Sequence, residues 1–188
     1  MSTVRILALV GSLRSGSHNR QLAEAAVALA PEGVEVELFE GLADIPYYNE
    51  DIDTEADVPA AAVRFRESAA AADGVILFSP EYNGTIPAVL KNAIDWASRP
   101  MGSGVFVGKP LAVVGTAYGQ YGGVWAQDEA KKSAGIAGAT VLSDVSLSIA
   151  ESVVRFAETH PREDSEVAEK IAAVVAQVAE ATKQPVAA

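Results

Sequence analysis

The stretch Ser79-Pro80-Glu81-Tyr82-Asn83-Gly84-Thr85-Ile86-Pro87 decides the fold, because of the segments on either side of it. The apolar residues 74–78 before it are too few for a helix and lack polar alternation, which predicts a strand buried on both faces. Pro87 fixes φ and lacks an N–H, which suits the first turn of a helix over residues 88–97. The stretch is therefore predicted to be the loop at the carboxyl end of a parallel strand, where open α/β sheets bind ligands.

The side chains of this loop suit a flat, polar heterocycle. Tyr82 offers an aromatic body and a hydroxyl, and Asn83 offers two donors and an acceptor. Gly84 allows backbone N–H groups to approach a ligand closely, and Pro80 stiffens the chain where it leaves the strand. The same residue types also dominate ordinary turns for backbone reasons alone, so a purely structural turn is the alternative.

A second loop with ligand-binding chemistry follows an earlier strand. Residues 4–10 are almost entirely apolar and predict the first strand. Over residues 19–29 the apolar residues have helical spacing, which predicts a helix. Between them, the N–H groups of the helix start point outward with partial positive charge, and an Arg can pair with a dianion. The residues assigned to this phosphate-binding loop are Ser12, Leu13, Arg14, Ser17, His18 and Asn19. A simple Ser/Gly connector with Ser17 or Asn19 as the helix cap is the alternative.

Two motifs carry a resemblance to a known family. Ser79–Gly84 followed by Leu90-Lys91-Asn92-Ala93-Ile94-Asp95-Trp96 resembles the signature of the NADPH-dependent FMN reductase family, which includes bacterial chromate and quinone reductases. The second motif consists of Gly11-Ser12-Leu13-Arg14 with Ser17 and Asn19. Both motifs lie in the order and spacing of the family, and the resemblance covers roughly residues 4–150.

The resemblance implies that the bound cofactor is FMN and that NADPH or NADH donates the hydride. The phosphate of FMN would lie at the first loop. The residues implied around the isoalloxazine ring are Pro80, Glu81, Tyr82, Asn83 and Gly84. A third, Gly-rich loop after an apolar strand over residues 111–116 would reach the pyrimidine edge of the ring through Thr116, Ala117 and Gly119.

The order of the predicted elements fits one α/β domain over residues 1–188. Further strands are predicted over residues 34–39, near an edge of the sheet, and over 140–142, with helices over 59–72, 124–137 and 166–182. Asp57 and Ser165 are the predicted caps of two of these helices, and residues 98–109 are predicted to form a surface connector. We expect a doubly wound, flavodoxin-like parallel sheet of five strands in the order 2-1-3-4-5, because its switch point lies between the strands that carry the two strongest loops.

Composition excludes several classes of protein. Lys and Arg number 14 and Asp and Glu number 25, so the net charge is −11, which disfavours binding to nucleic acid. There are no cysteines, hence no disulfides, thiolate metal sites or cysteine nucleophiles. No apolar run approaches the roughly 18 residues of a membrane span, and no signal peptide is recognisable, so we expect a cytoplasmic protein without membrane insertion.

The predicted activity is transfer of a hydride from NAD(P)H through FMN to a small-molecule acceptor: a quinone, free flavin, metal oxyanion or azo compound. No side chain is assigned a catalytic role and no metal is expected, because the flavin carries the chemistry. The alternatives are a non-enzymatic, flavodoxin-like electron carrier and a nucleotide-sensing regulatory protein. The resemblance, together with the apolar residues Ile86, Val89 and Trp96, suggests a homodimer or homotetramer.

Overall fold

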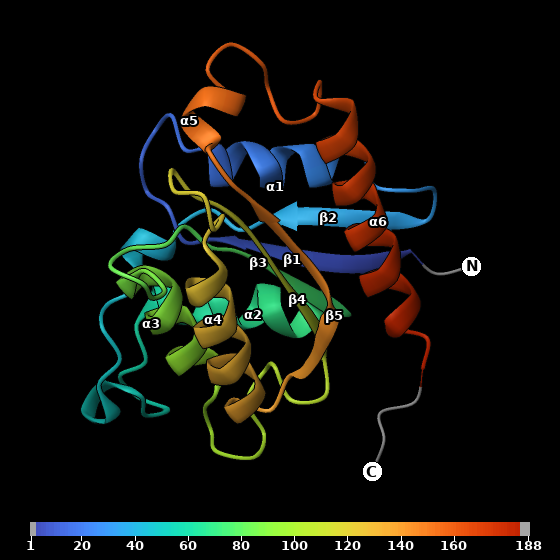
Figure 1. Ribbon diagram of the computed structural model, residues 1–188. Helices are drawn as coiled ribbons and strands as arrows, with labels where there is room; N and C mark the ends of the chain where they lie inside the picture. The colour runs from blue at the N-terminus through green and yellow to red at the C-terminus, as the bar shows by residue number, and fades with distance from the viewer. Residues whose placement is uncertain (1–2, 185–188) are drawn as a thin grey trace.

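The computed structural model describes residues 3–184. Five parallel strands form a sheet in the order β2-β1-β3-β4-β5, and helices cover both of its faces (Figure 1). The strands are β1 (Val4–Val10), β2 (Val34–Leu38), β3 (Gly74–Phe78), β4 (Pro110–Thr116) and β5 (Thr140–Ile149). The helices are α1 (His18–Ala28), α2 (Ala60–Ala71), α3 (Ala88–Ala97), α4 (Val124–Ile136), α5 (Ser152–Arg155) and α6 (Ser165–Ala181), with short 3-10 turns η1 (Leu42–Asp44) and η2 (Glu50–Ile52). The predicted flavodoxin-like sheet and its strand order are confirmed.

The register of the strands brings their carboxyl ends to one edge of the sheet. Val10 of β1 lies opposite Phe78 of β3, and Phe78 lies opposite Val114 of β4. The loops that follow β1, β3 and β4 therefore emerge side by side, and the end of β5 lies next to that of β4. This edge is where an open α/β sheet binds its ligand.

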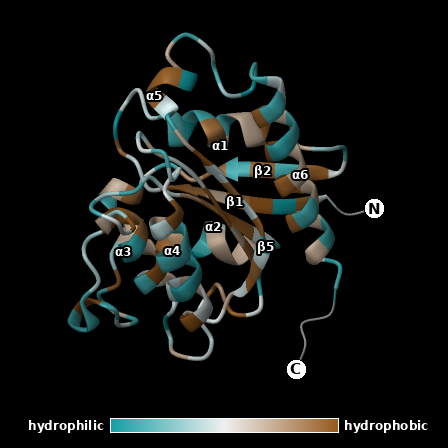
Figure 2. Ribbon diagram, viewed as in Figure 1, coloured by the Kyte–Doolittle hydropathy of each residue, from teal (hydrophilic) through white to brown (hydrophobic). Residues whose placement is uncertain are grey.

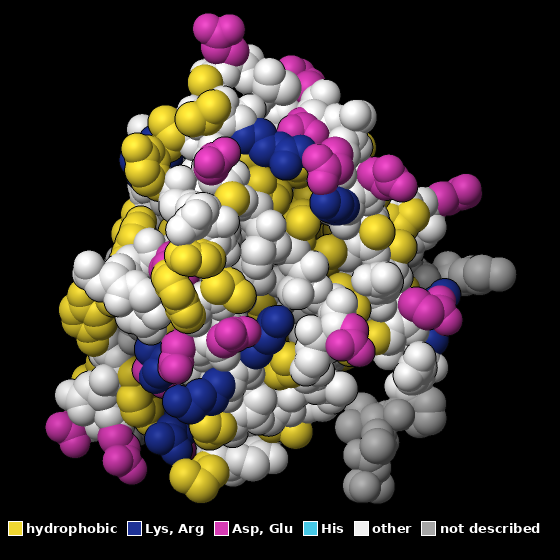
Figure 3. All heavy atoms as spheres, viewed as in Figure 1, with side chains coloured by type: hydrophobic (Ala, Val, Ile, Leu, Met, Phe, Trp, Pro, Cys, Tyr) yellow, Lys and Arg dark blue, Asp and Glu magenta, His cyan; other side chains and the backbone are white. Residues whose placement is uncertain are grey.

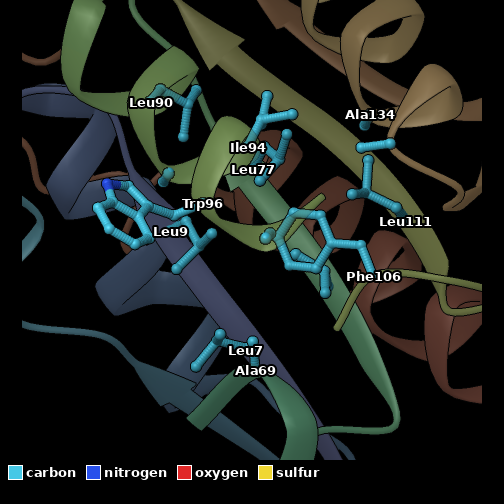
Figure 4. Packing of buried hydrophobic residues seen from close by; sticks show 14 of the residues in the cluster. Leu7, Leu9, Ala69, Leu77, Leu90, Ile94, Trp96, Phe106, Leu111 and Ala134 are labelled. Carbon is cyan, nitrogen blue, oxygen red and sulfur yellow. The ribbon is translucent and has the colours of Figure 1, made fainter. Parts of the chain in front are cut away.

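The core has two halves, one on each face of the sheet. Helices α2, α3 and α4 pack on one face, and α1 and α6 pack on the other. Hydrophobic residues are concentrated on the strands between these layers (Figure 2). Figure 4 shows Trp96 of α3 beside Leu9 of β1, with Leu77 of β3 on the same side of the sheet. The central strands are apolar along their whole length because both of their faces are covered.

Two residues that suggested a subunit contact belong to this core instead. Trp96 has no exposed surface, and its indole Nε1 donates a hydrogen bond to the Pro46 carbonyl at 2.8 Å. Ile86 is also buried, whereas Val89 is partly exposed. Trp96 lies on the core face of α3 and Ile86 is buried just before that helix, so neither of them supports the subunit contact that was predicted from them.

Both predicted helix caps differ from those in the structure. Asp57 does not cap α2; Pro59 occupies that position, and the Asp57 carboxylate instead accepts a hydrogen bond from the Thr54 hydroxyl. The cap of α6 is Asp164, whose side chain accepts a hydrogen bond from the Val167 N–H at 3.2 Å. The charged Asp164 carboxylate is a strong acceptor for the free N–H groups of the first turn, so the helix begins one residue before the predicted start.

The last third of the chain departs most from the predictions. Strand β5 extends well beyond the predicted residues 140–142. The prediction was too short because β5 lies at the edge of the sheet and exposes polar residues along one side. The predicted surface connector contains Phe106, which is fully buried in the core. Helix α5 was not predicted at all. Within residues 3–184, no helix has the length and apolarity that a membrane crossing requires.

A partly buried ion pair fastens the segment before α2 to the helix layer. Arg66 donates to both carboxylate oxygens of Asp53, at 2.6 and 2.8 Å, and its Nε donates to the Trp96 carbonyl at 3.0 Å. The hydrogen-bonded Arg66 guanidinium lowers the pKa of Asp53 below its usual value. The pair therefore contributes stability above the unfolded-state pKa of about 3.9, and that stability is lost as the pH falls through the lower, folded-state pKa.

We therefore expect Asp53→Asn to reduce the thermal midpoint at pH 7 and to flatten its decline toward pH 3. Thermal unfolding measured across this range checks the expectation. Asp51→Asn, an exposed neighbour, is the matched control and should follow the wild-type curve. If the thermal midpoints of wild type and Asp53→Asn fall in parallel as the pH is lowered, the ion pair does not contribute to the acid sensitivity of the fold.

Candidate active site

Residues from all the predicted loops surround one hollow of about 210 Å³ at the carboxyl edge of the sheet. The loop after β1 supplies Ser12, Arg14, Ser17, His18 and Asn19. The loops after β3 and β4 supply Pro80, Glu81, Tyr82, Thr116 and Ala117. Of the other predicted site residues, Leu13 and Gly119 line neighbouring hollows, and Asn83 and Gly84 form an exposed turn beside Tyr82.

The end of the hollow formed by the first loop has the properties of an anion site. Ser17 caps α1, and its side chain accepts a hydrogen bond from the Arg20 N–H, so the helix start faces this loop. Arg14 is exposed at the rim. His18 packs edge-on against Phe156, with ring centroids 5.6 Å apart. Burial, and then the positive charge of Arg14, lower the pKa of His18, so Arg14 carries the fixed positive charge near neutral pH.

Asn19, in the first turn of α1, joins this helix to the end of β4. Its Nδ2 donates to the Thr116 carbonyl at 2.9 Å, and its Oδ1 accepts from the Thr116 N–H at 3.0 Å. The Thr116 hydroxyl in turn donates to the Ile149 carbonyl at 2.8 Å. These bonds fasten α1, β4 and the end of β5 together under the hollow. The predicted phosphate ligand Asn19 thus has its amide committed to the backbone of Thr116.

The second loop contains a tight two-residue turn. Asn83 and Gly84 have φ of 54° and 76°, and Tyr82 and Thr85 exchange two backbone hydrogen bonds across them. This is the geometry that Asn-Gly favours. A purely structural turn therefore explains why Asn and Gly occupy these two positions. Glu81 accepts a hydrogen bond from the Ala126 N–H at 3.1 Å, in the first turn of α4. A carboxylate is stabilised at that end of a helix, so Glu81 positions α4 against the loop.

Two glycines allow these loops to approach one another. A Cβ at Gly11 would lie 2.6 Å from Pro87 Cγ, and a Cβ at Gly115 would lie 2.4 Å from the Ser79 carbonyl oxygen. Such distances are far shorter than van der Waals contact, so any side chain at either position would push the loops apart. Gly11 and Gly115 therefore help to set the width of the hollow.

Three residues of the hollow were not predicted from the sequence, namely Tyr118, Ser152 and Val153. Ser152 is buried, and its N–H donates to the Ala117 carbonyl at 3.0 Å, which ties the turn after β5 to the third loop. Tyr118 and Val153 are exposed at the rim. Exposed hydrophobic side chains gather over α5 and the loop before α4 (Figure 3). Only the aromatic ring of Tyr118, in a Gly-rich loop, offered a signal in the sequence.

The fold is that of a flavodoxin-like protein, and the hollow between the loops of β1, β3 and β4 is its candidate cofactor site. The family described as NADPH-dependent FMN reductase matches residues 4–153, and the chain belongs to this family. FMN is the flavin of the family, and NAD(P)H is its electron donor.

Individual relatives agree with this assignment. A 2-hydroxy-1,4-benzoquinone reductase from a Burkholderia species is 45% identical over 124 residues, which are 66% of this chain and 66% of that protein. A quinone reductase from Pseudomonas putida is 43% identical over 128 residues, or 68% of each chain. The chain thus spans about two thirds of the length of these relatives. The solved structure of FerB, a flavoenzyme NAD(P)H:(acceptor) oxidoreductase from Paracoccus denitrificans, superimposes with a TM-score of 0.85 at 31% identity, covering 96% of this chain and 98% of that one.

The residues of the hollow fit FMN. A phosphate dianion needs donors and a local positive charge in a protein of net charge −11, and Arg14, Ser12 and the capped start of α1 supply both. A flat ring needs an open wall with backbone groups and an aromatic edge, which Pro80, Tyr82 and Ala117 supply.

Proposed function

We propose that this chain is an FMN-dependent oxidoreductase that oxidises NAD(P)H and reduces a quinone, with free flavin, a metal oxyanion or an azo compound as other acceptors of the same class. The observation that carries the proposal is a hollow with a cationic helix start at one end and an open polar and aromatic wall at the other. Bound FMN supplies the capacity to accept and release a hydride. We further propose that residues 1–188 form a single FMN-binding domain.

The roles of the side chains follow from their positions. Arg14 would pair with the phosphate, and Ser12 and the start of α1 would donate hydrogen bonds to it. Pro80, Tyr82 and Ala117 would hold the ring. Asn19 and Glu81 act indirectly, because the first fixes Thr116 and the second fixes α4. Preorganised N–H groups near the ring lower the cost of the charge that reduction places on it.

Anaerobic stopped-flow mixing with NADPH or NADH tests the proposal. The flavin of the purified protein should lose its visible absorbance rapidly, and addition of a benzoquinone should restore it. A flavodoxin-like carrier has the same fold but requires a separate reductase, and a regulatory protein binds without turnover. Flavin that stays oxidised after mixing would therefore contradict the proposed activity.

Gly84 tests the ring side of the site. A Cβ at Gly84 would meet open space, but its φ of 76° is one that a β-branched residue adopts only with strain. Gly84→Val is expected to lower the free energy of unfolding by about 1–2 kcal/mol. If the turn also presents donors to the ring, FMN affinity should fall by about tenfold, as for one lost hydrogen bond.

Gly33→Val is the matched control, because Gly33 has φ of 82°, also faces open space and lies outside the hollow and outside the groove between α3 and α4. It should lose similar stability and keep its FMN affinity. Calorimetric titration and thermal melts of both variants supply the comparison. Equal FMN affinities in the two variants would make the Asn83–Gly84 turn purely structural.

We also propose that the protein is a homodimer or homotetramer. The support is an apolar groove between α3 and α4, where Met101 and Ile136 are 82% and 81% exposed. Light scattering at micromolar concentration should give at least twice the chain mass of 19.5 kDa. A monomer at that concentration would exclude the assembly, and Ile136→Asp should produce one if the groove is the contact.

A further inference from the structure

A second hollow lies beside the proposed flavin site. It has a volume of about 480 Å³ and lies between the loop at Tyr118–Tyr121 and the turn at Glu151–Val154. It shares Tyr118 and Val153 with the first hollow, so the two are contiguous. A ligand whose reactive end lies at the open wall of the first hollow can therefore extend into the second.

Glu151 is fixed at the edge of this second hollow in an unusual backbone conformation. Its φ and ψ are 54° and 38°, in the left-handed region; within residues 3–184, Asn83 is the only other residue except glycine with positive φ. Asn adopts this region readily, whereas Glu does so rarely. The N–H groups of Glu151 and Ser152 bond to the carbonyls of Gly119 and Ala117, which hold the turn against the third loop. Backbone strain of this kind persists where the surrounding structure enforces it, and it concentrates at functional sites.

The chemistry of the second hollow favours the adenosine half of NADH over that of NADPH. None of the described residues that line it is Lys, Arg or His, and its charged side chain is Glu151. A carboxylate accepts hydrogen bonds from a ribose diol, as in NAD-binding folds, but repels a 2′-phosphate. The rings of Tyr118 and Tyr121 offer aromatic surface to a purine.

The alternative site for the adenosine half is a hollow with arginine side chains, which would favour NADPH. It lies beside the loop after β1. This hollow, next to Arg14, includes Arg20, but the guanidinium of Arg20 is already bonded to Glu24 and Glu40. That hollow also adjoins the phosphate end of the flavin site rather than the wall assigned to the ring. It is therefore a poorer place for a donor whose nicotinamide must reach the ring.

We propose that the second hollow binds the adenosine half of the hydride donor and that Glu151 makes the protein prefer NADH to NADPH. The inference rests on the proposed function. The family is described as NADPH-dependent, and for this chain we expect NADH to be the better donor. Glu151 is a specificity-determining residue in this scheme and takes no part in the chemistry.

The first test is the ratio of kcat/KM for NADH to that for NADPH, with a benzoquinone as acceptor. Wild type should favour NADH by about tenfold or more, the effect of a charged hydrogen bond. Glu151→Gln should bring the ratio close to one, and Glu151→Lys should reverse it. Glu158→Lys is the matched control, because Glu158 is exposed, lies just beyond α5 and undergoes the same charge change outside the hollow. It should keep the wild-type ratio.

The second test needs no turnover. NAD⁺ and NADP⁺ are titrated against the purified protein while the fluorescence of Trp125 is followed, since Trp125 is half-exposed next to the hollow and the other tryptophan is buried. NAD⁺ should bind more tightly to wild type, and Glu151→Lys should invert the order of affinities. A wild type that prefers the phosphorylated dinucleotide, or a Glu151→Lys variant that behaves like Glu158→Lys, overturns the inference. If neither donor reduces the flavin while Glu151 still governs binding, it is the proposed activity that fails.

Discussion

Replacing Asn19 with Ala is expected to lower the free energy of unfolding by about 2–4 kcal/mol, because it leaves both backbone polar groups of Thr116 without a buried partner. Asn19 is 5% exposed, so water does not readily replace its amide. Thr116 ends β4 directly below the hollow, and its release should also displace Ala117. FMN affinity should therefore fall together with stability. Denaturant unfolding and calorimetric FMN titration measure the two effects.

Asn92 provides a closely matched control for this substitution. It is 7% exposed, its Oδ1 accepts from the Tyr48 N–H at 2.8 Å, and its Nδ2 donates to the Pro46 carbonyl at 3.0 Å. Asn92 therefore makes the same kind of bridge from a helix to the backbone of a distant segment, but away from the hollow. Asn92→Ala should lose similar stability and, below its unfolding transition, bind FMN as wild type does. If both variants bind FMN equally well, Asn19 is a structural residue with no influence on the site.

Replacing Arg14 with Ala is expected to weaken FMN binding by about 1.5–3 kcal/mol, or roughly 10- to 150-fold, the cost of a lost charged hydrogen bond. Arg14 is exposed, so its removal creates no cavity and should leave the thermal midpoint of the apoprotein nearly unchanged. Arg14 is the permanent cation of the hollow, since His18 has a lowered pKa. Among the described residues that line the hollow, no other side chain replaces its charge at neutral pH.

The control for Arg14→Ala is Arg64→Ala on the exposed side of α2, which removes the same charge outside the hollow. Riboflavin, which lacks the phosphate, gives a second comparison. It should bind wild type and Arg14→Ala with equal affinity. An FMN dissociation constant that matches the Arg64→Ala value, or a parallel loss for riboflavin, would remove Arg14 from the phosphate site.

The sheet was predictable from the sequence because its central strands have no polar face. Residues 74–78 and 111–116 are short apolar runs that end in Gly- and Pro-rich loops, a pattern typical of a strand covered on both sides. Strand β5 was underestimated for the opposite reason. An edge strand exposes one side to solvent, so its Ser and Asp residues resembled a loop.

The sequence by itself determined the strand order and the loops that build the site, because β1 and β3 flank the switch point of the flavodoxin-like order. Only the tertiary structure decided the partners of the polar side chains. Asn19 bonds to a residue 97 positions away, and Glu81 bonds to the start of α4. Their partners are backbone groups, which are alike at nearly every position and leave no mark in the sequence. Glu151 next to Gly119 is a further case, since this contact exists only because β5 lies beside β4.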